Sequence, residues 1–95
     1  MANYELMVIL DPALSDADQK KSITTIGKIL KDASGKKIKE DVWGEKKLAY
    51  KINGSEKGVY VLFTLELNGE NIKTINGLFN LEQEIWRYMF VNLDA

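Results

Sequence analysis

The segment of residues 57–67, K-G-V-Y-V-L-F-T-L-E-L, constrains the fold more than any other part of the chain. Every odd-numbered position from 59 to 67 is apolar, whereas the even-numbered positions change from Tyr60 and Leu62 to Thr64 and Glu66. An alternation with a period of two predicts a β-strand with one fully buried face. Because the other face is also apolar at its first end, the strand is expected inside a sheet rather than at its edge.

Three further strands and two helices are predicted around this central strand. The strands are expected at residues 4–10, 36–52 and 85–93, and the helices at residues 16–32 and 70–80. Ser15 is the expected N-cap of the first helix and Gly35 its stop. Gly44 separates two apolar sets within residues 36–52, so a bend or a bulge is expected there. Residues 53–55, N-G-S, predict the turn into the central strand.

The order β-α-β-β-α-β predicts one α+β domain over residues 1–95 with a ferredoxin-like fold. Two right-handed crossovers place both helices on one face of a four-stranded antiparallel sheet, with strand order 4-1-3-2. The helices are expected to cover the odd-numbered face of the central strand. The inward face of the last strand stays open, because aromatic residues at positions 86, 88 and 90 compete with apolar residues at 85, 89 and 91.

The sheet face turned away from the helices is predicted to be a surface for a protein partner. It is expected to carry Met7 and Ile9 from the first strand and Tyr60 and Leu62 from the central strand. An apolar face on a small domain favours contact with another protein. The alternative is a small patch that the chain's own loops shield.

Composition argues against an enzyme. The chain has no histidine and no cysteine, which removes the commonest general base, the commonest transition-metal ligands and any thiol nucleophile. No catalytic residue, cofactor, metal or small-molecule substrate is therefore predicted. The turn at residues 11–14, D-P-A-L, is acidic and lacks the glycines of a phosphate-binding loop. Short apolar runs and the absence of a signal-peptide pattern predict a cytoplasmic protein without a membrane helix.

The charge of the chain is unevenly distributed. Thirteen basic and 14 acidic residues give a net charge of −1. A protein that binds nucleic acid without a protein partner is usually clearly basic. Seven lysines face four acidic residues between positions 36 and 57, a local charge of +3. Such a bias is typical of a solvated sheet edge or of a contact with RNA. An RNA-recognition motif is disfavoured, because Val59 and Val61 stand where that motif needs stacking aromatic residues.

Residues 43–52, W-G-E-K-K-L-A-Y-K-I, carry the most specific motif of the chain. Together with residues 4–12, Y-E-L-M-V-I-L-D-P, they closely resemble the bacterial ribosomal protein family numbered six of the small subunit. That family has a W-G-x-basic-basic-L-A-Y-x-I segment on its second strand. It also has an arginine followed by a methionine on its last strand, and this chain has Arg87 and Met89 at the corresponding positions. The resemblance covers the whole chain in register. Lys51 departs from it, because the family often has proline there.

The resemblance implies a structural constituent of the small ribosomal subunit. Such a protein binds 16S ribosomal RNA in the central domain, the platform, as a heterodimer with small-subunit protein eighteen. If protein eighteen shares the RNA site, this chain needs to make only a few phosphate contacts, which is consistent with its net charge of −1. The alternative function is a free-standing α+β module that binds a protein or a ligand on its open sheet face.

The resemblance also implies five RNA-binding residues. Lys46, Lys47 and Arg87 are expected to contact phosphates, and Tyr4 and Tyr50 to pack on sugars or bases. For the two lysines the alternative is protection of a sheet edge, and for Tyr50 it is core or edge packing.

Overall fold

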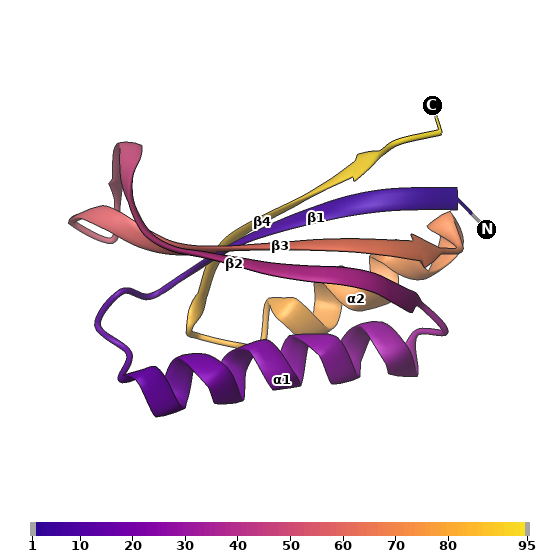
Figure 1. Ribbon diagram of the computed structural model, residues 1–95, viewed down its shortest axis with the longest axis horizontal. Coiled ribbons are helices and arrows are strands. Elements are labelled where there is room, and N and C mark those ends of the chain that lie inside the picture. The colour runs from indigo at the N-terminus through magenta and orange to yellow at the C-terminus, as the bar shows by residue number, and fades with distance from the viewer. Residues whose placement is uncertain (1, 95) are drawn as a thin grey trace.

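The computed structural model describes residues 2–94 and shows a sheet covered on one face by two helices (Figure 1). The elements are β1 (Ala2–Leu10), α1 (Asp16–Asp32), β2 (Lys36–Ile52), β3 (Ser55–Leu67), a 3-10 turn (Gly69–Asn71), α2 (Ile72–Phe79) and β4 (Ile85–Asn92). The strands lie in the order β2-β3-β1-β4, and every neighbouring pair is antiparallel. The predicted ferredoxin-like α+β fold with strand order 4-1-3-2 is confirmed.

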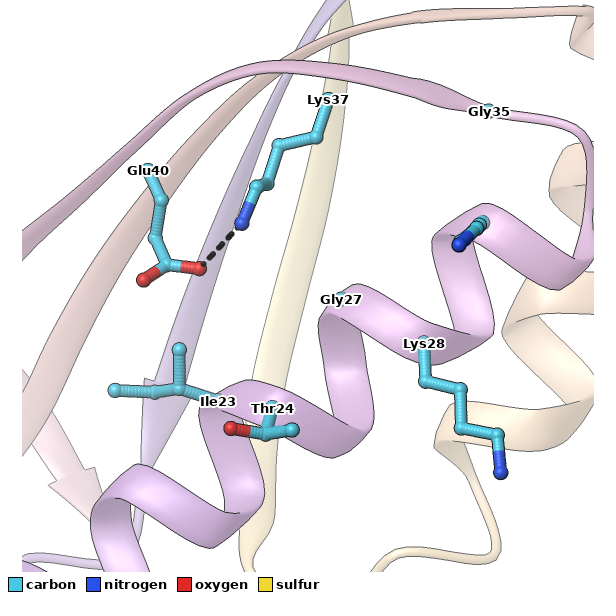
Figure 2. Close-up of a pocket in the computed structure, with 8 residues that line it drawn as sticks. Ile23, Thr24, Gly27, Lys28, Gly35, Lys37 and Glu40 are labelled. Carbon is cyan, nitrogen blue, oxygen red and sulfur yellow. Dashed lines mark hydrogen bonds and ion pairs between the residues drawn. The ribbon is translucent and has the colours of Figure 1, made fainter.

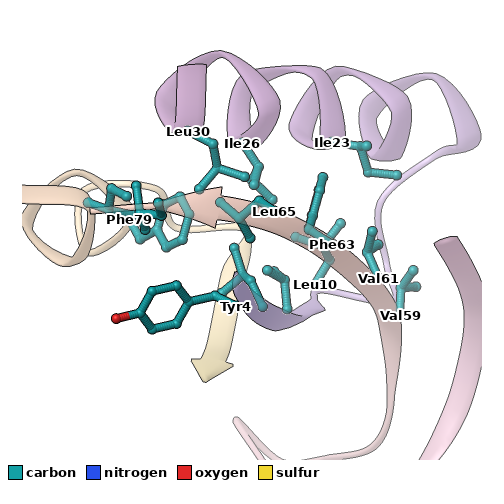
Figure 3. Packing of buried hydrophobic residues seen from close by; sticks show 14 residues of the cluster. Tyr4, Leu10, Ile23, Ile26, Leu30, Val59, Val61, Phe63, Leu65 and Phe79 are labelled. Atoms are coloured by element: carbon teal, nitrogen blue, oxygen red, sulfur yellow. The ribbon is translucent and has the colours of Figure 1, made fainter. Parts of the chain in front are cut away.

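The core lies between the sheet and the helices (Figure 3). As predicted, the odd-numbered positions of β3 from Val59 to Leu67 are all buried, and Phe63 is 0% exposed. The core also includes residues of β1 (Tyr4, Leu6, Val8, Leu10), of α1 (Ile23, Ile26, Leu30) and of α2 (Ile75, Phe79). No helix within residues 2–94 is long and apolar enough to cross a membrane.

Local chemistry explains where α1 begins and ends. The Ser15 hydroxyl accepts a hydrogen bond from the Asp18 N–H at 3.2 Å and so caps the first turn, as predicted. At the other end, Ser34 rather than Gly35 has the positive φ, +63°. Position 35 has room only for glycine, because a Cβ at this position would lie 2.8 Å from the carbonyl oxygen of Leu30. The predicted stop is therefore correct in place, but its cause is a close approach of two backbones.

The β2–β3 hairpin is bent away from the helices near its tip (Figure 1). Gly44 has a φ of +83°, and Trp43 is an extra residue between the pairs Val42–Val61 and Gly44–Tyr60. This is the bulge predicted at Gly44. A larger irregularity follows. Between the pairs Lys47–Lys57 and Ile52–Ser55, four residues of β2 (48–51) lie opposite one residue of β3, Glu56.

The bend changes which side chains of β2 are buried. Leu48 and Ile52 are buried, whereas Tyr50, which has the same parity along β2, is 67% exposed. A shift in strand register ends the simple alternation of faces, so parity does not predict the exposure of Tyr50. Gly58 on β3 leaves the space for this arrangement, because a Cβ there would lie 2.5 Å from Cγ2 of Ile9 and 3.3 Å from Cδ2 of Leu48.

The structure settles the faces of β4. Tyr88 and Phe90 pack against the core, and the rings of Tyr88 and Phe79 meet edge to face with centroids 5.1 Å apart. Arg87, Met89 and Val91 alternate with them, are exposed and lie on the open face.

Candidate RNA and protein interface

The open face of the sheet brings the four predicted partner residues together. Met7 pairs with Leu62 and Ile9 with Tyr60 across β1 and β3, and all four side chains are half-buried. On the other side of β1, Met89 pairs with Met7 and Arg87 with Ile9. The open face therefore contains two parallel rows of side chains, Leu62–Met7–Met89 and Tyr60–Ile9–Arg87.

Two adjoining hollows lie over these rows. One has a volume of about 340 Å³ and is lined by Met7, Ile9, Tyr50, Tyr60, Arg87 and Met89, among others. The other has a volume of about 310 Å³ and is lined by Glu5, Met7, Trp43, Leu62, Met89 and Val91. Met7 and Met89 line both hollows, so the two form one continuous, mostly apolar surface.

The bent hairpin carries Tyr50 to this surface. Tyr50 lines the same hollow as Ile9, Tyr60 and Arg87. This position, together with its exposure, excludes the alternative of core packing for Tyr50. The structure thus joins two predicted RNA-binding residues, Tyr50 and Arg87, to the predicted partner residues. The guanidinium of Arg87 is held by a hydrogen bond from Nη1 to the Trp86 carbonyl oxygen at 2.7 Å.

Lys46 and Lys47 lie on the bent part of β2 and are both exposed. They pair with Gly58 and Lys57, and adjacent strand residues point to opposite faces of the sheet. Nearby, Lys57 forms an ion pair with Glu45 at 3.5 Å. Within residues 2–94, neither Lys46 nor Lys47 is in an ion pair. Both charges are therefore available to an anionic ligand.

Tyr4 does not join this surface. It is 7% exposed and belongs to the core, where its ring meets that of Phe90 edge to face with centroids 6.2 Å apart. Its hydroxyl accepts a hydrogen bond from Nδ2 of Asn92 at 3.5 Å. The prediction that the Tyr4 ring packs on RNA does not fit this position, because a stacking ring needs an open face.

Sequence reasoning missed several residues of the open face. Trp43, beside the Gly44 bend, lines the second hollow and donates a hydrogen bond from Nε1 to Oδ2 of Asp41 at 3.2 Å. Met89 lines both hollows, and Glu5 is the acidic residue of the second. The pairing of Met89 with Met7 would have indicated its face, but that pairing is known only from the sheet register.

The remaining acidic groups do not form a metal centre. Within residues 2–94, no three Asp or Glu side chains gather in a way that could hold a metal ion. Glu82 and Glu84 lie close together near the start of α1. A hydrogen bond with Glu84, some desolvation and the charge of Glu84 raise the pKa of Glu82 above its ordinary value.

Known proteins resemble this chain over almost its full length. The family model described as "Ribosomal protein S6" matches residues 3–92. The small ribosomal subunit protein bS6 of Corynebacterium efficiens is 32% identical over 94 residues, which cover 99% of each chain. The bS6 protein of Acidothermus cellulolyticus is 33% identical over 95 residues, which cover 100% of this chain and 99% of that one.

A solved structure agrees with the sequence relatives. The crystal structure of 30S ribosomal protein S6 from Thermotoga maritima matches with a TM-score of 0.90 and 24% identity, over 96% of this chain and 86% of that chain. The chain therefore belongs to the ribosomal protein S6 family, whose members are structural proteins of the small ribosomal subunit in the cytoplasm.

Proposed function

We propose that this chain binds 16S ribosomal RNA in the central domain of the small subunit as a heterodimer with small-subunit protein eighteen. One observation carries the proposal. Tyr50 and Arg87, the proposed RNA contacts, line the same hollow as Met7, Ile9 and Tyr60, the proposed partner contacts. A surface of this kind would contact the protein partner and the RNA side by side.

The partner's share of the surface is the apolar one. The row Leu62–Met7–Met89 runs across three strands, and Met7 and Met89 line both hollows. Apolar side chains of protein eighteen would fill these hollows and remove the row from water, which is the usual source of affinity at the centre of a protein interface. Methionine side chains adapt well to such contacts.

The RNA's share is the basic rim. Lys46, Lys47 and Arg87 would contact phosphates, and the exposed ring of Tyr50 would pack on a sugar or a base. This is a small number of cations for a chain with a net charge of −1. Because phosphate contacts supply most of the non-specific affinity for RNA, the chain alone should bind weakly.

The first prediction follows from this division of the surface. The isolated chain is expected to bind a central-domain RNA fragment weakly, and to bind it tightly once protein eighteen is added. A filter-binding titration with and without protein eighteen measures the difference. Tight, salt-sensitive binding by the isolated chain would contradict the shared surface.

A free-standing binding module is the alternative, since the same open face could serve another partner. Sedimentation of ribosomes from cells through a high-salt wash separates the two functions. The proposed function requires the chain to remain with the small subunits, whereas a module with another partner would stay in the supernatant.

The second prediction concerns Lys46 and Lys47. The double change Lys46→Ala, Lys47→Ala is expected to weaken the complex of chain, protein eighteen and RNA. It should also lower the log–log salt slope by up to two phosphate contacts, each worth about 0.7–0.9. Unfolding stability should change by no more than about 0.5 kcal/mol, because both side chains are exposed. Affinity measured at several salt concentrations checks the result.

A matched control is the double change Lys21→Ala, Lys73→Ala, which removes the same charge from exposed helix positions. It should leave the salt slope unchanged. If Lys46 and Lys47 only protect a sheet edge, their removal would leave RNA binding intact and increase self-association of the free protein. Analytical ultracentrifugation of the free variants detects that outcome.

A further inference from the structure

A second basic surface lies between α1 and β2, far from the hairpin tip. A groove of about 690 Å³ runs there and is lined by Lys28 and Lys31 of α1 and by Lys37 of β2. Figure 2 shows Lys28 on the helix and Lys37 on the strand. Gly27 and Gly35 also line it, and a side chain at Gly27 would meet nothing within 4 Å. Lys37 and Lys46 are nine positions apart on β2, which corresponds to roughly 25–30 Å along a strand.

The charge of this groove is positive and mostly unneutralised. Residues 19–31 of α1 include no acidic residue, and residues 36–39, K-K-I-K, add lysines at the start of β2. The one acidic side chain in the groove, Glu40, pairs with Lys37 at 3.1 Å. Within residues 2–94, Lys28 and Lys31 are in no ion pair. Because the Lys37–Glu40 pair is partly exposed, a stronger anion could replace the carboxylate.

The shape of the β2 edge indicates what kind of ligand fits. Ile38 is an extra residue between the pairs Lys37–Leu65 and Lys39–Thr64, and Trp43 is a second one farther along. Bulges of this kind oppose the addition of another strand to a sheet edge. A ligand of this groove would therefore contact the lysine side chains rather than the backbone of β2. An RNA strand offers a row of phosphates that lysines of α1 and of β2 could contact at the rim of the groove.

We propose that the groove between α1 and β2 is a second binding site for the sugar–phosphate backbone of RNA. This inference rests on the proposed function, because it extends the RNA contact from the hairpin tip along β2 to its first residues. The bound RNA then contacts lysines near both ends of β2. The site uses phosphate contacts only and carries no base specificity.

The third prediction tests the groove with the double change Lys28→Gln, Lys31→Gln. Affinity of the heterodimer for the central-domain RNA fragment should fall by roughly fourfold to fivefold per lost contact at about 0.15 M salt. The log–log salt slope should fall by about 0.7–0.9 per contact. The control Lys21→Gln, Lys73→Gln has the same net charge and should match the unmodified chain. Unfolding midpoints and heterodimer formation are measured for both variants, and both should be unchanged.

The outcomes separate this inference from the proposed function. If Lys28→Gln, Lys31→Gln leaves affinity and slope intact while Lys46→Ala, Lys47→Ala reduces them, the groove is not an RNA site and the proposed function stands. If the groove variant binds protein eighteen more weakly but shows an unchanged salt slope once protein eighteen is saturating, a protein segment occupies the groove and the inference is wrong. If the unmodified heterodimer binds no RNA, both the inference and the proposed function fail.

Discussion

Phe63→Ala is expected to lower the free energy of unfolding by about 3–5 kcal/mol, the usual cost of emptying a large aromatic site in a core. Phe63 is fully buried in the middle of β3, beneath the helices. Because β3 is paired with β1 on one side and β2 on the other, its backbone cannot move easily to close the cavity. Urea unfolding of the isolated chain measures the loss.

Tyr60→Ala is the matched control for Phe63. Both are aromatic residues of β3, three positions apart, but Tyr60 is half-buried on the open face. Truncation of Tyr60 removes less buried apolar surface, because water already contacts part of its side chain. The loss of unfolding free energy should therefore be clearly smaller in the isolated chain. Equal losses for the two variants would mean that the open face contributes to the core as much as the helix-covered face does.

The regular parts of the fold follow from the sequence because their signals are local. The period of two in residues 57–67 gives the strand and its buried face directly, and the Ser15 cap gives the start of α1. The strand order follows from chain connectivity, since right-handed crossovers leave few arrangements. These expectations need no knowledge of contacts between distant residues.

The hairpin shows where local reasoning ends. Gly44 indicates a bulge, but the number of residues displaced before the turn depends on the pairing with β3. Residues 48–51 of β2 stand opposite a single residue of β3, Glu56, and this mismatch turns the β2 chain. Tyr50 therefore reaches the open face, whereas Leu48 and Ile52 are buried. The position of Tyr50 in the hollow with Arg87 therefore could not be obtained from residue parity.

The Tyr4 ring lies elsewhere than predicted and the sequence leaves the faces of β4 open, and the two results have opposite causes. The alternation of β1 places Tyr4 on the face of Leu6, Val8 and Leu10, so its burial was available from the sequence. The RNA contact expected of Tyr4 came from the family resemblance and disagreed with this alternation. In β4 the local signal is itself ambiguous, because the outward residues Met89 and Val91 are apolar. Apolar residues on an outward face conflict with simple patterning, and such conflicts are expected at functional surfaces.

Met89→Asp is expected to have the largest effect on partner binding. Met89 is 62% exposed on the edge strand β4 and lines both hollows of the open face. A carboxylate there would be taken out of water at the proposed interface, and this desolvation would oppose binding even though Arg87 lines the same hollow. Affinity for protein eighteen should fall by at least about 2 kcal/mol, or roughly 30-fold, as for other central contact residues. Isothermal titration calorimetry measures this change.

Leu81→Asp is the control for the added charge, since Leu81 is an apolar residue with 77% exposure that lines neither hollow. It should bind protein eighteen as the unmodified chain does. Because both side chains are largely exposed in the free chain, neither change should unfold it, and thermal unfolding verifies this. Unchanged affinity for the Met89→Asp variant would show that protein eighteen does not cover the centre of the open face. Tyr50 and Arg87 would then meet RNA on a surface that the partner leaves free.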